Sequence, residues 1–232
     1  MHYVMGDVHG EYDKFLSMLE QIDFTDDDLL FVLGDVLDRG PEPVKLLTDL
    51  SMRSNVYLLL GNHELMALDV LRELLVEITE ENCDRQITAD LLKRLLFWQR
   101  EGGEITLKQL RALPKEDRLA LLEFLEELPA YEVVDVGDVT YILVHAGLGN
   151  YAPERRLSSY TPEELTCMRP EPDTVYYDGE SIRVLMGHTP TRLINGTDRI
   201  VRSGNAVFLD CGATFGGKLA CLCLETQQEF YV

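Results

Sequence analysis

The stretch FVLGDVLDRG, residues 31–40, decides the fold of this chain. Its apolar run stops at Gly34, and two aspartates and an arginine follow at Asp35, Asp38 and Arg39. Burying these charges without partners would cost roughly several kcal/mol each. We therefore expect other parts of the chain to supply partners for them, and we expect this strand end to lie at a functional site.

The same arrangement recurs on two neighbouring apolar runs. Short polar motifs follow each run: HYVM (2–5) precedes GDVHG, LLFVL (29–33) precedes GDVLDRG, and VYLLL (56–60) precedes GNHE. Residues 12–19 and 43–50, between these runs, have the apolar spacing of amphipathic helices, and Pro41 and Pro43 suit a first helical turn. Alternation of continuous apolar strands with helices predicts a parallel sheet that is buried on both faces. Open sheets of this kind place their sites at these strand ends.

The remainder of the chain adds helices and then more strands. Residues 65–128 have helical spacing that breaks at Gly102-Gly103 and at Pro114, which predicts a helical insertion packed beside the sheet. We expect residues 1–232 to form a single domain. Two apolar runs then flank Gly137-Asp138, as in a tight hairpin.

The last third of the chain reads as a loop followed by strands. Residues 149–180 are polar and contain prolines, which predicts a loop. The tail, with the runs RVLM, AVFL, KLACLCL and EFYV, is rich in predicted strands. Turn signals lie at Asn195-Gly196 and Gly216-Gly217.

Composition limits the classes of function. The chain has 232 residues, of which 46% are hydrophobic, enough for one well-packed domain. A formal net charge of −20 argues against nucleic acid as a partner. There is no apolar run near 18 residues and no signal-peptide pattern, so we expect a cytoplasmic protein that does not bind membranes. The five cysteines include no CxxC pair, and Cys221 and Cys223 are expected to share one face of a strand.

The histidines carry the strongest functional signal. Four of the five follow apolar runs, within GDVHG, GNHE, HAG and GHT: His9, His63, His145 and His188. Aspartate, asparagine and histidine together suit manganese, iron or zinc. Asp7 and His9 can face one ion from a single loop, and Asp35 is a candidate bridge between two ions. Asn62, His145 and His188 would complete the second ion's ligands, and two ions about 3.5–4 Å apart would clamp a phosphoryl group.

These five motifs, GDVHG, GDVLDRG, GNHE, HAG and GHT, resemble those of the phosphoprotein phosphatase family of metallophosphoesterases, in the same order and over nearly the whole chain. The bacterial serine/threonine-phosphatase-like branch is the most similar, and WQREGGEITL (98–107) resembles its insertion segment. The resemblance implies an α/β (α+β) fold: a four-layer sandwich of mixed sheets flanked by helices, with a helical insertion. It also implies two divalent ions, manganese foremost and iron or zinc as alternatives.

The resemblance also implies a role for each motif residue. Asp7 and His9 would hold the first metal, Asp35 would bridge, and Asn62, His145 and His188 would hold the second. His63 would be the general acid, oriented by Asp38, and Arg39 would bind phosphate. Arg169, in the loop after HAG, is the expected second phosphate arginine, with Arg155 and Arg156 as alternatives. Leu60 stands where eukaryotic members commonly have arginine, which makes the phosphate pocket less basic than theirs.

Three functions follow from this resemblance. The leading hypothesis is hydrolysis of phosphoserine or phosphothreonine by metal-activated hydroxide. The alternative on the same fold is symmetrical hydrolysis of diadenosine tetraphosphate, or of another small phosphoester. Those tetraphosphatases typically lack the DRG aspartate and have GNHD, whereas this chain has Asp38 and Glu64, which favours the phosphatase. A phosphodiesterase is disfavoured because GHTP replaces the usual GHxH. The third function, an inactive metal-binding scaffold, normally involves loss of ligands, and this chain retains them all.

Overall fold

The computed structural model describes residues 1–76, 88–177 and 181–232. Within them, ten strands form two five-stranded sheets. In the first sheet, β1 (His2–Met5), β2 (Leu29–Val32) and β3 (Val56–Leu58) pair in parallel, and β9 (Ala220–Cys223) and β10 (Glu229–Tyr231) extend it antiparallel on the other side of β1. The predicted parallel half-sheet is therefore confirmed.

The second sheet has the order β4-β5-β6-β8-β7. Its strands are β4 (Tyr131–Val136), β5 (Val139–Val144), β6 (Ile182–Met186), β8 (Ala206–Phe208) and β7 (Val201–Ser203). The β4–β5 pair is the predicted hairpin, and Gly137 has the positive φ of 61° that its tight turn needs. Because β5, β6 and β8 run parallel while β4 and β7 run antiparallel to them, both sheets are mixed.

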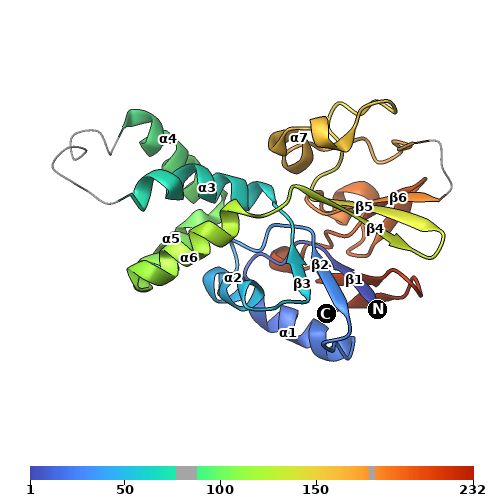
Figure 1. Ribbon diagram of the computed structural model, residues 1–232, viewed down its shortest axis with the longest axis horizontal. Coiled ribbons are helices and arrows are strands. Elements are labelled where there is room, and N and C mark those ends of the chain that lie inside the picture. The colour runs from blue at the N-terminus through green and yellow to red at the C-terminus, as the bar shows by residue number, and fades with distance from the viewer. Residues whose placement is uncertain (77–87, 178–180) are drawn as a thin grey trace.

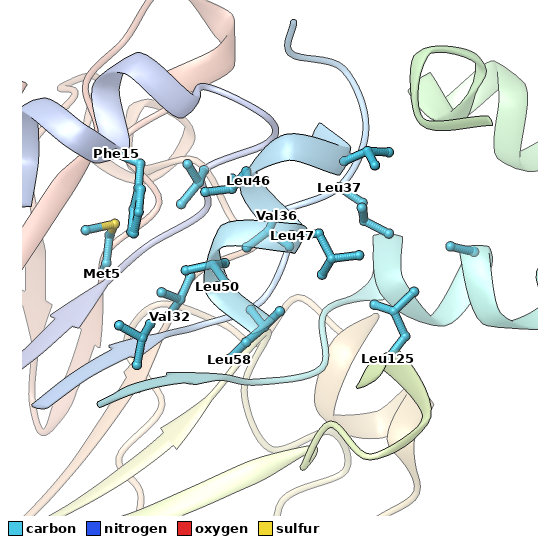
Figure 2. Close-up of a cluster of buried hydrophobic side chains, with 14 of the residues drawn as sticks. Met5, Phe15, Val32, Val36, Leu37, Leu46, Leu47, Leu50, Leu58 and Leu125 are labelled. Carbon is cyan, nitrogen blue, oxygen red and sulfur yellow. The ribbon is translucent and has the colours of Figure 1, made fainter. Parts of the chain in front are cut away.

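Alternation along the strands assigns side chains to three buried layers. In β1, Val4 faces the layer between the sheets, while Tyr3 and Met5 face the helices of the first sheet's outer face. That outer layer contains α1 (Tyr12–Gln21) and α2 (Pro43–Ser51), and Figure 2 shows Met5 and Phe15 within it. On the second sheet, Leu143 faces inward and Ile142 faces outward. The layers are therefore helix, sheet, sheet and helix, as expected.

The predicted insertion is helical where the structure describes it. It contains α3 (Asn62–Leu74), α4 (Ala89–Trp98), α5 (Glu104–Ala112) and α6 (Lys115–Glu126), which lie together to one side of the sheets in Figure 1. Residues 77–87 of the predicted helical stretch lie outside the described residues. A π-helical turn, Gln99–Gly103, joins α4 to α5, and Gly102 adopts a φ of 113° there. Trp98 and Leu125 share one buried cluster with Met5, so the insertion and the first sheet have a common core.

The second half differs from prediction in two places. The expected loop 149–180 contains a short helix, α7 (Pro162–Thr166), because Thr161 accepts the N–H of Glu164 and forms a capping box with it. Residues 178–180 of that loop lie outside the described residues. The signal at Asn195-Gly196 ends another short helix, α8 (Thr191–Asn195), instead of joining two strands. None of the described helices combines the length and apolarity needed to cross a bilayer.

Candidate metal centre and active site

The predicted site residues come together where the strands of both sheets end. Asp7 follows β1, Asp35 follows β2, Asn62 and His63 open α3 after β3, His145 follows β5, and His188 follows β6. A cavity of about 320 Å³ lies over them. Its lining comprises Asp35, Arg39, Asn62, His63, Met66, Phe97, Glu101, Cys167, Arg169 and His188.

Asp35 lies between two groups of candidate metal ligands. One group is His9, Asp35 and His63, and the other is Asp35, His145 and His188, with the ligand atoms of each group within 4.8 Å of one another. Oδ2 of Asp35 lies 3.5 Å from Nε2 of His9, whereas Oδ1 lies 3.4 Å from Nε2 of His145. Each carboxylate oxygen thus faces a different group, which is the arrangement of a bridging ligand.

Backbone carbonyls orient two of these histidines for metal binding. Nδ1 of His9 donates to the carbonyl oxygen of Leu37 at 2.8 Å, and Nδ1 of His145 donates to that of Leu33 at 2.6 Å. Such bonds fix the ring and leave Nε2 as the ligand atom. Asn62 joins the second group, because its Oδ1 lies 3.0 Å from Nε2 of His145. The donor set and its orientation therefore fit divalent ions.

Burial and the contacts among these side chains shift the pKa values of the ionisable groups at the centre. Burial alone would raise the pKa of Asp35, but the nearby His145 and His63 hold that pKa well below its usual value. Burial lowers the pKa of His145, yet the Asp35 carboxylate outweighs it and raises this pKa to about 10. His9 has no such excess of carboxylate, and burial lowers its pKa to about 3. Metal binds the neutral form of histidine, so His9 is already in the binding form, whereas His145 would release its Nε2 proton on binding an ion.

Asp7 occupies a different position from the other predicted ligands. It is buried, it belongs to neither group above, and both of its oxygens accept the backbone N–H of His188 at 3.0 Å. Burial and the neighbouring Asp210 raise the pKa of Asp7 well above its usual value. Asp210, which follows β8, is a buried carboxylate that the sequence reasoning missed. Gly187 allows this packing, since a Cβ there would lie 2.0 Å from Oδ1 of Asp7.

Glu64 holds the loop that carries Asp35. Its side chain is fully buried and accepts four backbone N–H groups, those of Asp35, Val36, Leu37 and Gly61, at 2.7–3.0 Å. Burial, together with the Asp35 charge, raises the pKa of Glu64 to about 7. In the sequence analysis Glu64 served only to distinguish substrate classes. In the structure its carboxylate connects the loop after β2 to the loop after β3.

Asp38 receives three side-chain hydrogen bonds and is wholly buried. His63 donates from Nδ1 to its Oδ2 at 2.7 Å, and Trp98 donates from Nε1 to the same oxygen at 2.8 Å. Thr106 donates to Oδ1 at 2.6 Å and accepts the backbone N–H of Asp38 at 3.0 Å. Trp98 and Thr106 are the ends of the segment WQREGGEIT, so the insertion fixes the carboxylate that orients His63.

His63 is arranged to carry a proton toward the cavity. Burial lowers its pKa, but Asp35 and Asp38 outweigh this effect and hold the pKa above its usual value. Because Nδ1 donates to Asp38, a second ring proton would occupy Nε2, which lies 4.0 Å from Oδ2 of Asp35. A protonated Nε2 can donate to a leaving group but cannot bind metal.

The candidate phosphate-binding arginines differ in whether they line the cavity. Arg39 lines the cavity, and its Nη1 lies 2.6 Å from Nε2 of His9. Arg169 also lines the cavity, where Nη1 donates to the carbonyl oxygen of His188 at 3.0 Å. Arg155 instead binds Glu164 through both terminal nitrogens and lies over the Tyr160 ring. The structure thus brings Arg169 to the centre and leaves Arg155 outside the cavity lining.

The site loops hold their side chains in an unusual backbone conformation. Five non-glycine site residues have positive φ, between 46° and 70°: His9, Asp35, Asp38, Arg39 and His188. L-residues rarely adopt this region, and sites are where proteins tolerate such strain. These five residues lie in three loops, those after β1, β2 and β6.

Comparison with known proteins agrees with this geometry. The family model described as calcineurin-like phosphoesterase matches residues 3–222. A symmetrical bis(5'-nucleosyl)-tetraphosphatase of Salmonella typhimurium is 27% identical over 98% of this chain and 93% of its own length. The asymmetrical bis(5'-nucleosyl)-tetraphosphatase PrpE of Halalkalibacterium halodurans is 25% identical over 94% of this chain and 88% of its own. A symmetrical enzyme of Wigglesworthia glossinidia brevipalpis is 34% identical over 43% of this chain, a match that spans 38% of that relative.

Solved structures share the fold. One described as "a putative diadenosine tetraphosphatase" has a TM-score of 0.68 at 18% identity, covering 100% of this chain and 92% of its own. A Saccharomyces cerevisiae protein serine/threonine phosphatase has a TM-score of 0.56 at 14% identity, covering 100% and 78%. The ligand-type residues at the strand ends agree with a family match over nearly the whole chain. The chain belongs to the calcineurin-like phosphoesterase family and is a metal-dependent hydrolase of phosphoesters.

Proposed function

We propose that the protein hydrolyses bis(5'-nucleosyl) tetraphosphates, the alternative function that the sequence suggested, in preference to phosphoproteins. The observation that carries this proposal is similarity to named tetraphosphatases over 98% of the chain. Symmetrical cleavage breaks the central P–O–P bond with water and gives two nucleoside diphosphates. The proposal includes one domain, from residue 1 to 232, and a cytoplasmic location, where the four free cysteines described would stay reduced.

The residues at the cavity would have two roles in this reaction, binding of phosphate and donation of a proton. Arg39 and Arg169 line the cavity and are suited to donate to phosphate oxygens. His63, oriented by Asp38, would deliver its Nε2 proton to the oxygen that leaves the attacked phosphorus. Asp35 and Asp38 outweigh burial and raise the pKa of His63, which favours the protonated ring that this step needs.

The metal ligands proposed are those of the sequence analysis, arranged around Asp35. His9 and Asp35 would hold one ion, and Asp35, Asn62, His145 and His188 the other, with Asp7 completing the first shell beside His9. Divalent ions here supply Lewis acidity toward the phosphoryl oxygens and the attacking water. The mixed oxygen and nitrogen donors suit manganese, iron or zinc.

Phosphoserine and phosphothreonine hydrolysis stays the second candidate because the chain has Asp38 and Glu64. Neither residue lines the cavity, however: Asp38 orients His63, and Glu64 binds backbone N–H groups. Both residues therefore act on the geometry of the site and make no direct contact with a substrate there. This reduces their value for telling the two substrates apart.

A direct comparison of substrates tests the proposal. The protein is stripped of metal, reloaded with Mn²⁺, and assayed for kcat/KM on diadenosine tetraphosphate and on phosphothreonine peptides. We expect the dinucleotide to be preferred and ADP to be the sole product by ion-exchange chromatography. Preference for the peptides would establish the second candidate. ATP plus AMP as products would show asymmetrical cleavage, and activity on neither with metal bound would leave another small phosphoester or an inactive scaffold.

A further inference from the structure

Part of the cavity lining is apolar and offers no group that would bind phosphate. Phe97, at the end of α4, lines the cavity although 55% of the residue is exposed, and Met66 of α3 lines it beside Phe97. The neighbouring Trp98 is fully buried against Asp38. Two adjacent residues of α4 therefore have different roles. Trp98 fixes the Asp38 carboxylate, and Phe97 exposes its ring at the cavity.

The cavity lining contains side chains of both charges. Arg39 and Arg169 supply cations suited to phosphate. Glu101, in the turn after α4, adds an exposed carboxylate to the same lining. A carboxylate placed against phosphate would be repelled. The part of the ligand that meets Phe97 and Glu101 is therefore an uncharged group with an apolar face and hydrogen-bond donors.

We propose that Phe97 and Met66 form a platform on which a nucleobase of the substrate stacks, while Glu101 accepts a hydrogen bond from the base or the ribose. This inference rests on the proposed function and names what distinguishes nucleotides from other phosphoesters at this site. Aromatic rings stack on every base because each base has a π face, and an open, rigid ring loses little entropy on binding. Phe97 is then a specificity-determining residue contributed by the insertion.

The test separates base recognition from phosphate recognition. Phe97→Ala, Phe97→Tyr and the control Leu96→Ala are prepared as Mn²⁺-loaded enzymes. Leu96 is 51% exposed on the same helix and does not line the cavity. Calorimetry measures Kd for two non-hydrolysable ligands, adenosine 5'-(α,β-methylene)diphosphate and inorganic methylenediphosphonate, which share the P–CH2–P group and differ in the nucleoside.

We expect Phe97→Ala to weaken binding of the nucleotide analogue by about ten-fold and to leave methylenediphosphonate unchanged, since a stacked base contributes ~1–3 kcal/mol. Phe97→Tyr should retain wild-type affinity for both ligands, as should Leu96→Ala. Equal weakening of both ligands by Phe97→Ala, or no weakening of either, would overturn the platform.

Kinetics distinguishes this failure from failure of the proposed function. With diadenosine tetraphosphate, Phe97→Ala should raise KM by a similar factor and leave kcat unchanged. If the wild type does not hydrolyse the dinucleotide but still loses nucleotide affinity selectively in Phe97→Ala, the platform stands and the proposed substrate is wrong. If the wild type hydrolyses it and Phe97→Ala changes neither KM nor Kd, the substrate stands and the platform is wrong.

Discussion

Replacing Thr106 by valine tests whether the insertion holds Asp38 in place. Thr106 is fully buried and makes two hydrogen bonds to Asp38, one to the carboxylate and one from the backbone N–H. Valine keeps the shape but removes both bonds. A hydrogen bond to a charged group contributes ~1.5–3 kcal/mol, and an orphaned buried N–H costs ~1–3 kcal/mol. Together these give an expected loss of about 2.5–6 kcal/mol in the free energy of unfolding for Thr106→Val.

Urea denaturation in a metal chelator measures this loss without a contribution from bound ions. Thr106→Ser keeps the hydroxyl and should recover most of the stability. Thr140→Val is the matched control, since Thr140 also donates to an aspartate, Asp135, at 2.6 Å, but Asp135 is exposed. An exposed bond of this kind contributes little, and valine is favourable in a strand. The control should therefore unfold at nearly the wild-type urea concentration.

Turnover gives a second measurement that is independent of stability. Because Asp38 orients His63 and does not line the cavity, Thr106→Val should lower kcat more than it raises KM. Equal destabilisation by Thr106→Val and Thr140→Val, or a normal kcat in Thr106→Val, would refute the role of the insertion in positioning Asp38.

Three further substitutions test the site. His63→Asn should lower kcat by ~10²–10⁴-fold while metal content stays normal, because the loss is that of a general acid; near-normal turnover would contradict this. Gly187→Ala places a Cβ 2.0 Å from Oδ1 of Asp7 and should weaken metal binding in a titration, whereas unchanged affinity would show that Asp7 is no ligand. Arg169→Ala should raise KM by about ten-fold or more, and Arg155→Ala should leave it unchanged; the reverse pattern would exchange their roles.

The sequence was sufficient to predict the architecture because its signals are local. Val4 between Tyr3 and Met5 shows the apolar continuity of a strand buried on both faces, and the structure places these side chains in two different layers. The glycines and prolines likewise marked the hairpin turn and the breaks in the insertion. The helix α7 was missed because its capping box, Thr161 with Glu164, stands in a segment with too few apolar residues to show helical periodicity.

The sequence was sufficient to name candidate site residues but not to predict the hydrogen bonds that hold them in place. Aspartates and histidines after strands identify the centre, because strand ends converge wherever sheets are open. The bonds from Trp98 and Thr106 to Asp38 span 60 and 68 residues, and no spacing rule connects them. Asp210 follows its strand as the candidate ligands follow theirs, and that position was the available signal for it.

The substrate class is the property that the motifs predict least well. Glu64, one of the two residues on which the substrate prediction was based, binds the backbone of the loops. The surfaces that meet the substrate beyond its phosphates come from Phe97, Glu101 and Met66, whose contribution depends on how the insertion packs. That packing is a tertiary property, whereas the leading prediction of a phosphoprotein substrate was drawn from Asp38 and Glu64, which do not line the cavity.

Anomalous diffraction from crystals of the Mn²⁺-loaded protein tests directly whether Asp35 joins two metal sites in one centre. We expect two anomalous peaks per chain, about 3.5–4 Å apart. One peak should lie beside Nε2 of His9 and the other beside Nε2 of His145, with one Asp35 oxygen facing each ion. A single peak per chain, or two peaks that Asp35 does not separate, would show that Asp35 is not a bridging ligand.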